Sequence, residues 1–165
     1  MGKKAQAAIE YLSTYGWAIL IMLVAVVLLL WLGIVSPRTP LQSTCLFPAD
    51  MLCRGYVLNT AGNYKIDMGQ STGHPINVTG IKCTANATAG TLDAISPHKM
   101  ISNGDHDVIT NGTQFCYLAN GSVASGRAGN MYKGRIFIEY IELDTGFTRQ
   151  VVGDVSLKYE DVEVS

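Results

Sequence analysis

The chain has 165 residues, a formal net charge of −1 and a hydrophobic content of 48%. This length accommodates one ordinary domain together with one additional element. The near-neutral charge excludes the strongly basic surface with which proteins bind nucleic acid non-specifically, so we expect no nucleic-acid partner.

The apolar residues are concentrated near the N-terminus. No charged residue occurs from 11 to 37, and residues 17–35 are apolar throughout apart from Gly33. A helix rises about 1.5 Å per residue, so this stretch reaches roughly 40 Å, more than the ~30 Å hydrocarbon core of a bilayer. We therefore predict a hydrophobic helix over 6–35 that serves as a membrane span or as the core of a filament.

Charges on either side of this helix predict its orientation. Lys3 and Lys4 precede the apolar run, which favours a cytoplasmic N-terminus and an exported C-terminal part. The run is too long for a cleavable secretory signal peptide. A plain signal anchor explains the whole segment except Glu10, a carboxylate at the edge of the apolar run.

The residues around Glu10 resemble the class III signal peptide of archaeal type IV pilins. The matching segments are Lys3-Lys4-Ala5, Gln6-Ala7-Ala8-Ile9-Glu10-Tyr11-Leu12 and Thr14-Tyr15-Gly16-Trp17-Ala18-Ile19-Leu20. The resemblance implies that a prepilin peptidase removes residues 1–5 by cutting between Ala5 and Gln6. Glu10 then becomes the fifth mature residue, where type IV pilins share a glutamate. One departure is Ala5, because glycine is common at that position in the family.

Glu10 has a physical use under this interpretation. Cleavage creates a free amino group on Gln6, about one helical turn from the carboxylate. When helices bundle, the Gln6 ammonium of an axially offset neighbour can pair with the buried Glu10 carboxylate and so specify the stagger. The alternative is that Glu10 stays solvated in the lipid headgroup region and has no role in assembly.

The remainder of the chain has the composition of a β domain joined by a short linker. Residues 36–44 form the predicted linker, because Pro37 ends the helix, and residues 45–165 form an extracellular head. The predicted strands are Leu52–Asn59, Tyr64–Met68, Ile76–Cys83, Asp107–Thr110, Gln114–Leu118, Arg135–Leu143 and Phe147–Tyr159, the last broken near Gly153. Asp144-Thr145-Gly146 is a hairpin signal between the last two.

Seven short strands with frequent turns favour an immunoglobulin-like arrangement. The predicted fold class is therefore a long hydrophobic N-terminal α-helix followed by an all-β head, an immunoglobulin-like β-sandwich.

All four cysteines lie in the predicted head, and their even number suits pairing in an oxidising exterior. Four cysteines allow three pairings. We expect Cys45–Cys53 to close the N-terminal loop and Cys83–Cys116 to join two strands, with four reduced thiols as the alternative.

Four Asn-x-Ser/Thr sequences also lie in the head and are candidates for N-glycosylation, at Asn77, Asn86, Asn111 and Asn120. The alternative is that these sequences are never modified.

No arrangement of residues in the head predicts catalysis or a cofactor. We expect His74, His98 and His106 to stand in unrelated loops, and Asn103-Gly104-Asp105-His106-Asp107 is typical of a polar turn before it is typical of a metal site. The sequence lacks HExxH, CxxC, Gly-x-Ser-x-Gly and a phosphate loop. We expect no enzyme activity, no cofactor and no metal.

Together these features predict a structural subunit of an archaeal type IV pilus-like filament at the cell surface. The subunit would form a homo-oligomer through its N-terminal helix, with prepilin peptidase and the pilus assembly machinery as partners, and act in adhesion or surface contact. Before assembly it would be a single-pass membrane protein. The alternative is a minor pilin or membrane-anchored surface protein that captures sugars or another ligand through its β head. An archaellin subunit is a close relative of the first interpretation.

Overall fold

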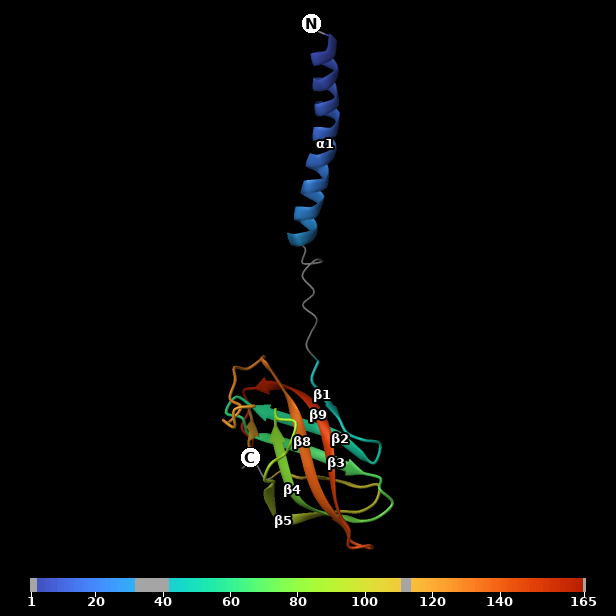
Figure 1. The fold of residues 1–165 in the computed structure, drawn as a ribbon, viewed down its shortest axis with the longest axis vertical. Coiled ribbons are helices and arrows are strands. Elements are labelled where there is room, and N and C mark those ends of the chain that lie inside the picture. Colours follow the sequence, from blue (N-terminus) through green and yellow to red (C-terminus); the bar gives the residue numbers. More distant parts are fainter. Residues whose placement is uncertain (1–2, 32–41, 111–113, 165) are drawn as a thin grey trace. The chain divides into compact units, whose positions relative to one another are not determined.

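The structure is a computed structural model that describes residues 3–31, 42–110 and 114–164, with side chains in the first segment at 13 and 15–31. The chain divides into two compact units, Met1–Pro40 and Leu41–Ser165. The first contains a single described helix, and the second contains all the described strands (Figure 1).

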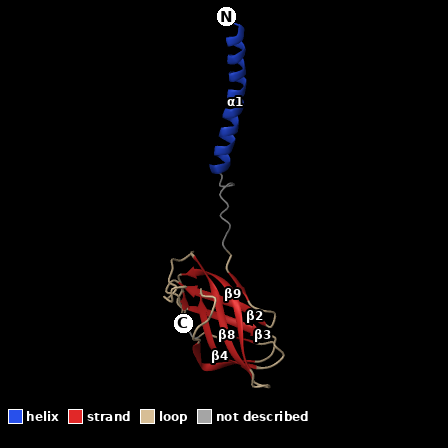
Figure 2. Ribbon diagram, viewed as in Figure 1, coloured by secondary structure: helices blue, strands red, loops and turns tan. Residues whose placement is uncertain are grey.

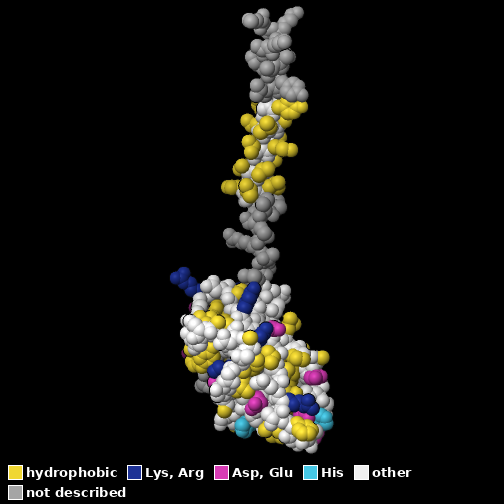
Figure 3. All heavy atoms as spheres, in the orientation of Figure 1, with side chains coloured by type: hydrophobic (Ala, Val, Ile, Leu, Met, Phe, Trp, Pro, Cys, Tyr) yellow, Lys and Arg dark blue, Asp and Glu magenta, His cyan; other side chains and the backbone are white. Residues whose placement is uncertain are grey.

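The helix α1 (Lys3–Trp31) has 29 residues. It contains no proline and is rich in alanine and leucine, which favour helical backbone. The described side chains along it are all exposed. Among the large apolar ones the exposed fraction runs from 43% at Leu29 to 87% at Trp31, and these side chains cover the described part of the helix in Figure 3.

The predicted membrane span must be corrected. Among the residues described, no helix combines the length and the apolar character that crossing a bilayer requires. The predicted localisation as a single-pass membrane protein before assembly, with a transmembrane helix over 6–35 and a cytoplasmic N-terminus, is therefore wrong for the described chain. Residues 32–35 and most of the predicted linker lie outside the described residues.

The second unit consists of strands and loops (Figure 2). Its strands are β1 (Thr44–Leu46), β2 (Met51–Asn59), β3 (Tyr64–Gln70), β4 (Ile76–Thr84), β5 (Asp93–Ile101), β6 (His106–Val108), β7 (Cys116–Tyr117), β8 (Met131–Glu142) and β9 (Thr148–Glu160).

All of these strands belong to one sheet, and its main path runs β5-β4-β8-β9-β2-β3-β6, with β1 on β9 and β7 on β4. β9 joins the two halves because it pairs antiparallel with β8 along most of its length and parallel with β2 at its end. An immunoglobulin-like sandwich has two separate sheets. The predicted fold class is therefore corrected to a helix over Lys3–Trp31 and a head built from one continuous sheet. Alternating apolar residues indicate one buried face in either arrangement, so the sequence pattern did not distinguish them.

The sheet curls so that its two ends approach each other. β5 and β6 are the end strands, and Lys99 Nζ on β5 lies 3.2 Å from Asp107 Oδ2 on β6. The enclosed core is formed mainly by inward-facing residues of β3, β4, β8 and β9, including Ile66, Met68, Ile76, Val78, Ile81, Ile136, Ile138, Val155 and Leu157. A register shift between Val78 and Gly80 lets both Val78 and Ile81 face this core although they are three residues apart.

Each of the seven predicted strands has a counterpart, but β1 and β5 were not predicted. β5 contains Pro97 and leaves most of its residues exposed or half-buried, as is usual for an edge strand, and so shows no alternation. The predicted break near Gly153 is wrong, because β9 is continuous there. The ring of Phe47 occupies the space beside Gly153, where a Cβ atom would lie 2.5 Å from ring atoms.

Both expected disulfides are present in the head. Cys45–Cys53 has an S–S distance of 2.06 Å and closes the loop between β1 and β2. Cys83–Cys116 joins β4 to β7, where the two residues are register partners. Both members of the second bond are fully buried, so it lies within the core, whereas the first lies at its margin.

Candidate functional site

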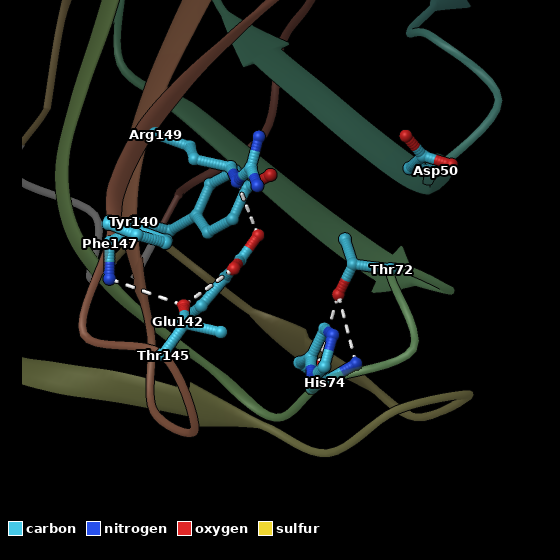
Figure 4. A pocket seen from close by; sticks show the side chains of 8 residues that line it. All are labelled: Asp50, Thr72, His74, Tyr140, Glu142, Thr145, Phe147 and Arg149. Atoms are coloured by element: carbon cyan, nitrogen blue, oxygen red, sulfur yellow. Dashed lines mark hydrogen bonds and ion pairs between the residues drawn. The ribbon is translucent and has the colours of Figure 1, made fainter.

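A pocket of about 320 Å³ lies at one end of the head, where the loops β1–β2, β3–β4 and β8–β9 meet. Charged, hydroxyl-bearing and aromatic side chains line it: Asp50, Thr72, His74, Tyr140, Glu142, Thr145, Phe147 and Arg149. Figure 4 shows Glu142 and Arg149 on one side of the pocket and Asp50 on the other, with Thr72 and His74 between them.

Backbone hydrogen bonds tie the three loops together. The Ser71 N–H donates to the Asp50 carbonyl at 2.9 Å, which joins β3–β4 to β1–β2. The Leu143 N–H donates to the Pro75 carbonyl, also at 2.9 Å, which joins the β8–β9 hairpin to β3–β4. The walls of the pocket are therefore fixed by contacts that exist without a ligand.

A buried glutamine fixes the β3–β4 wall from behind. The Gln70 side-chain amide donates to the carbonyls of His74 and Ile101, at 3.0 and 3.1 Å. Its oxygen accepts hydrogen bonds from the backbone N–H and the hydroxyl of Thr72, at 2.9 and 2.8 Å. The hydrogen-bonding groups of this buried side chain are thus all satisfied: they hold Thr72 and His74 in place and tie this loop to Ile101 at the end of β5.

Glu142 forms the deepest charged part of the pocket, with its side chain only 7% exposed. The Thr145 hydroxyl donates to its Oε2 at 2.8 Å, and Arg149 Nε forms an ion pair with its Oε1. The hydrogen bond from Thr145 is the main cause that holds the pKa of Glu142 below its usual value; burial opposes this shift and Arg149 adds to it. The carboxylate is therefore ionised at neutral pH and can accept hydrogen bonds, but it is poorly suited to donate a proton as a general acid.

Two aromatic residues complete the pocket. Tyr140 is buried, and this burial, followed by the nearby charge of Glu142, raises the pKa of its hydroxyl, which stays protonated. Phe147 is 63% exposed. The pocket thus combines one buried aromatic ring with one that is open to solvent.

Asp50 differs from the other charged residues of the pocket. It is exposed, and its carboxylate has no hydrogen bond or ion pair with any residue in the described ranges. Nearby, His74 Nδ1 lies 2.9 Å from Asp144 Oδ2, so that pair is already engaged. Asp50 is therefore the carboxylate most available to an incoming ligand.

The residues expected to act in processing and assembly lie in α1. Ala5, Gln6 and Glu10 fall within the helical backbone Lys3–Trp31, and their side chains lie outside the described residues.

The four glycosylation candidates occupy different environments. Asn86 and Asn120 are exposed in turns, whereas Asn77 lies on β4 with its Oδ1 buried. Asn111 lies outside the described residues. Asn86 and Asn120 are thus the positions at which a glycan would meet least steric hindrance.

The three histidines do not converge. His74 lines the pocket, His98 lies on β5, and His106 Nδ1 is 3.0 Å from Asp67 Oδ1 on β3. Within the ranges given above, no three histidine, cysteine or acidic residues are grouped so that they could hold a metal ion.

Sequence reasoning missed the pocket itself. Asp144 and Thr145 were interpreted only as hairpin residues, and nothing in the local pattern links them to Asp50 or His74. The one available signal was the concentration of Glu142, Thr145, Phe147 and Arg149 around a single turn.

Comparisons with protein-family models, with curated proteins and with solved structures find no match to this chain.

Proposed function

We propose that this chain is a structural subunit of a helical filament similar to archaeal type IV pili, in which the α1 helices of many copies pack together. The observation that carries this proposal is the described surface of α1, where every large apolar side chain is exposed. A helix with apolar residues on all sides is stable only when other groups cover it. Burying one leucine, isoleucine or methionine side chain contributes about 1.5–3 kcal/mol, so many copies side by side gain a large driving force.

The surface of α1 also offers a shape suited to such packing. Ser13, Gly16, Trp17 and Leu20 line a concavity of about 330 Å³. Their spacing is i, i+3, i+4 and i+7, the four positions that form a hole for a side chain of a facing helix. A Cβ atom at Gly16 would meet nothing within 4 Å, so the glycine leaves the hole open. A large apolar side chain of a neighbouring copy can therefore insert at this place.

Processing and register follow from the same proposal. A prepilin peptidase cuts between Ala5 and Gln6, and the new Gln6 ammonium pairs with Glu10 of an offset neighbour. Because an unpaired carboxylate in an apolar bundle is costly, this pair favours one stagger over the others.

The β head has a structural rather than an enzymatic role in this proposal. It forms the outer layer of the filament, and glycans at the exposed Asn86 and Asn120 would lie on that layer. The two disulfides support assembly in an oxidising compartment, because such bonds persist there. Adhesion or surface contact is the role we assign to the filament.

Two matched substitutions test the proposal. Leu23 on α1 and Leu52 on β2 are exposed to nearly the same degree, 60% and 63%. Leu23→Glu places a charge among packed helices and should abolish filaments, whereas Leu52→Glu should leave them intact. Electron microscopy and sedimentation of the full chain provide the measurement. Filaments of normal length and yield from the Leu23→Glu chain would contradict the proposal.

The processing step has its own test. Mass spectrometry of the assembled protein should give Gln6 as the first residue, and Glu10→Ala should reduce assembly without affecting cleavage. An intact Met1 in native filaments would exclude the cut, and normal filaments from Glu10→Ala would exclude the pairing with Gln6.

A further inference from the structure

We propose that the pocket between the β1–β2, β3–β4 and β8–β9 loops is a binding site for a neutral saccharide of one or two rings. This inference concerns the head alone and does not depend on whether the chain forms filaments. The volume of the pocket, about 320 Å³, lies at the lower end of the range typical of small-molecule sites.

The charges that face the pocket, two carboxylates and one guanidinium, disfavour an anion throughout the pocket and a cation beside Arg149. An anion would approach the unpaired carboxylate of Asp50 and the ionised Glu142. A cation would approach the guanidinium of Arg149, which is half-exposed beside Glu142. A hydroxyl group both donates and accepts hydrogen bonds, so a polyhydroxylated neutral ligand can donate to Asp50 on one side and accept from Arg149 on the other.

The aromatic residues fit the same ligand class. Phe147 exposes most of its ring, and this exposure has no role in the core of the head. The C–H face of a sugar ring can cover that surface while its hydroxyl edge meets polar groups. A site of this kind combines aromatic surface with a few fixed polar groups that orient the ligand.

The polar groups are also held before any ligand binds. Gln70 fixes Thr72 and His74 from behind, and the Ser71–Asp50 backbone bond fixes the position of Asp50 relative to them. The disulfide Cys45–Cys53 closes the loop that carries Asp50. Binding therefore requires little ordering of these loops, which is the condition under which a small polar ligand gains affinity.

Saturation-transfer difference NMR on the full chain tests the proposal, because the method observes the ligand and tolerates a large assembly. The probes are the methyl glycosides of glucose, galactose, mannose and N-acetylglucosamine, with glucuronate and glucosamine as charged counterparts. At least one neutral glycoside should receive saturation, and glucuronate should receive none. Saturation of glucosamine alone, saturation of glucuronate, or no saturation of any probe would overturn the proposal.

Variants locate the site. Asp50→Asn keeps the shape of the side chain but loses a charge-assisted hydrogen bond, and should raise the dissociation constant of the bound glycoside about tenfold to a hundredfold. Phe147→Ala should raise it about tenfold. The matched controls are Asp161→Asn, beyond the opposite end of β9, and Leu46→Ala, an exposed apolar residue outside the pocket. Equal effects of the pocket and control variants would show that the glycoside binds elsewhere.

Discussion

Removing the two disulfides separately should destabilise the head to different degrees, and the difference can be calculated from the chain. The bonds close loops with sequence separations of 8 for Cys45–Cys53 and 33 for Cys83–Cys116. In the loop-entropy model these lengths correspond to about 2.5 and about 3.7 kcal/mol of the free energy of unfolding at 25 °C. The disulfide that closes the longer loop, Cys83–Cys116, should therefore contribute about 1.2 kcal/mol more to the free energy of unfolding.

The magnitude can be measured as a shift in melting temperature. The head has about 125 residues, and at roughly 2.1 cal/mol/K per residue 1 kcal/mol corresponds to about 4 °C. The double variant Cys83→Ala/Cys116→Ala should then melt about 5 °C below Cys45→Ala/Cys53→Ala. Loss of packing around the buried pair adds to this difference, because Cys83 and Cys116 lie inside the core.

Thermal and guanidinium unfolding of the full chain, followed by the circular dichroism of the strands, provide the assay. The unsubstituted chain in reducing buffer serves as the control for side-chain effects, because it loses both bonds without losing any sulfur atom. If removing Cys45–Cys53 lowered the free energy of unfolding as much as removing Cys83–Cys116, or more, the reasoning would be refuted. Neither loop length nor burial would then determine how much each disulfide stabilises the head.

Two further predictions concern a glycine and a carboxylate. Gly62 has φ +93°, and a Cβ atom there would lie 2.8 Å from the Ala124 carbonyl oxygen, whereas Gly129 has φ +92° and open space. In chemical unfolding, Gly129→Ala should lower the free energy of unfolding by about 1 kcal/mol, and Gly62→Ala should lower it by about 1–3 kcal/mol more. Equal decreases for the two variants would contradict the steric argument. Folding lowers the pKa of Glu142 from 4.5, so the ionised carboxylate stabilises the folded state. This stabilisation is complete above about pH 4.5 and is lost as the pH falls through the folded pKa. Glu142→Gln should therefore flatten the fall in the free energy of unfolding in that acid range, and an unchanged pH profile would contradict the role of Thr145 and Arg149.

Local sequence patterns predicted most strands and the disulfides, because these depend on local alternation and on few possible pairings. The hairpin at Asp144-Thr145-Gly146 was predicted from the turn residues themselves, and β8 and β9 do pair around it. β5 was missed because an edge strand with Pro97 carries little alternation.

What the sequence did not predict depends on how distant segments meet. The parallel pairing of Leu58 with Tyr159 merges what would otherwise be two sheets, and no local pattern encodes that contact. The pocket has the same origin, because Asp50 and His74 come from two loops and Glu142 from the end of β8, and these positions are far apart in the sequence. The membrane span was predicted from length and apolarity over 6–35, and the described part of the helix does not meet that requirement.

The approach of β5 and β6 has a consequence for how copies of the head behave when they are crowded. An open sheet end presents unpaired N–H and C=O groups to which a strand of a neighbouring molecule can add. Here the two end strands face each other across the Lys99–Asp107 pair, and Pro97 removes one N–H donor from β5. When heads are held at high local density, addition of a neighbour's strand at β5 or β6 is therefore disfavoured.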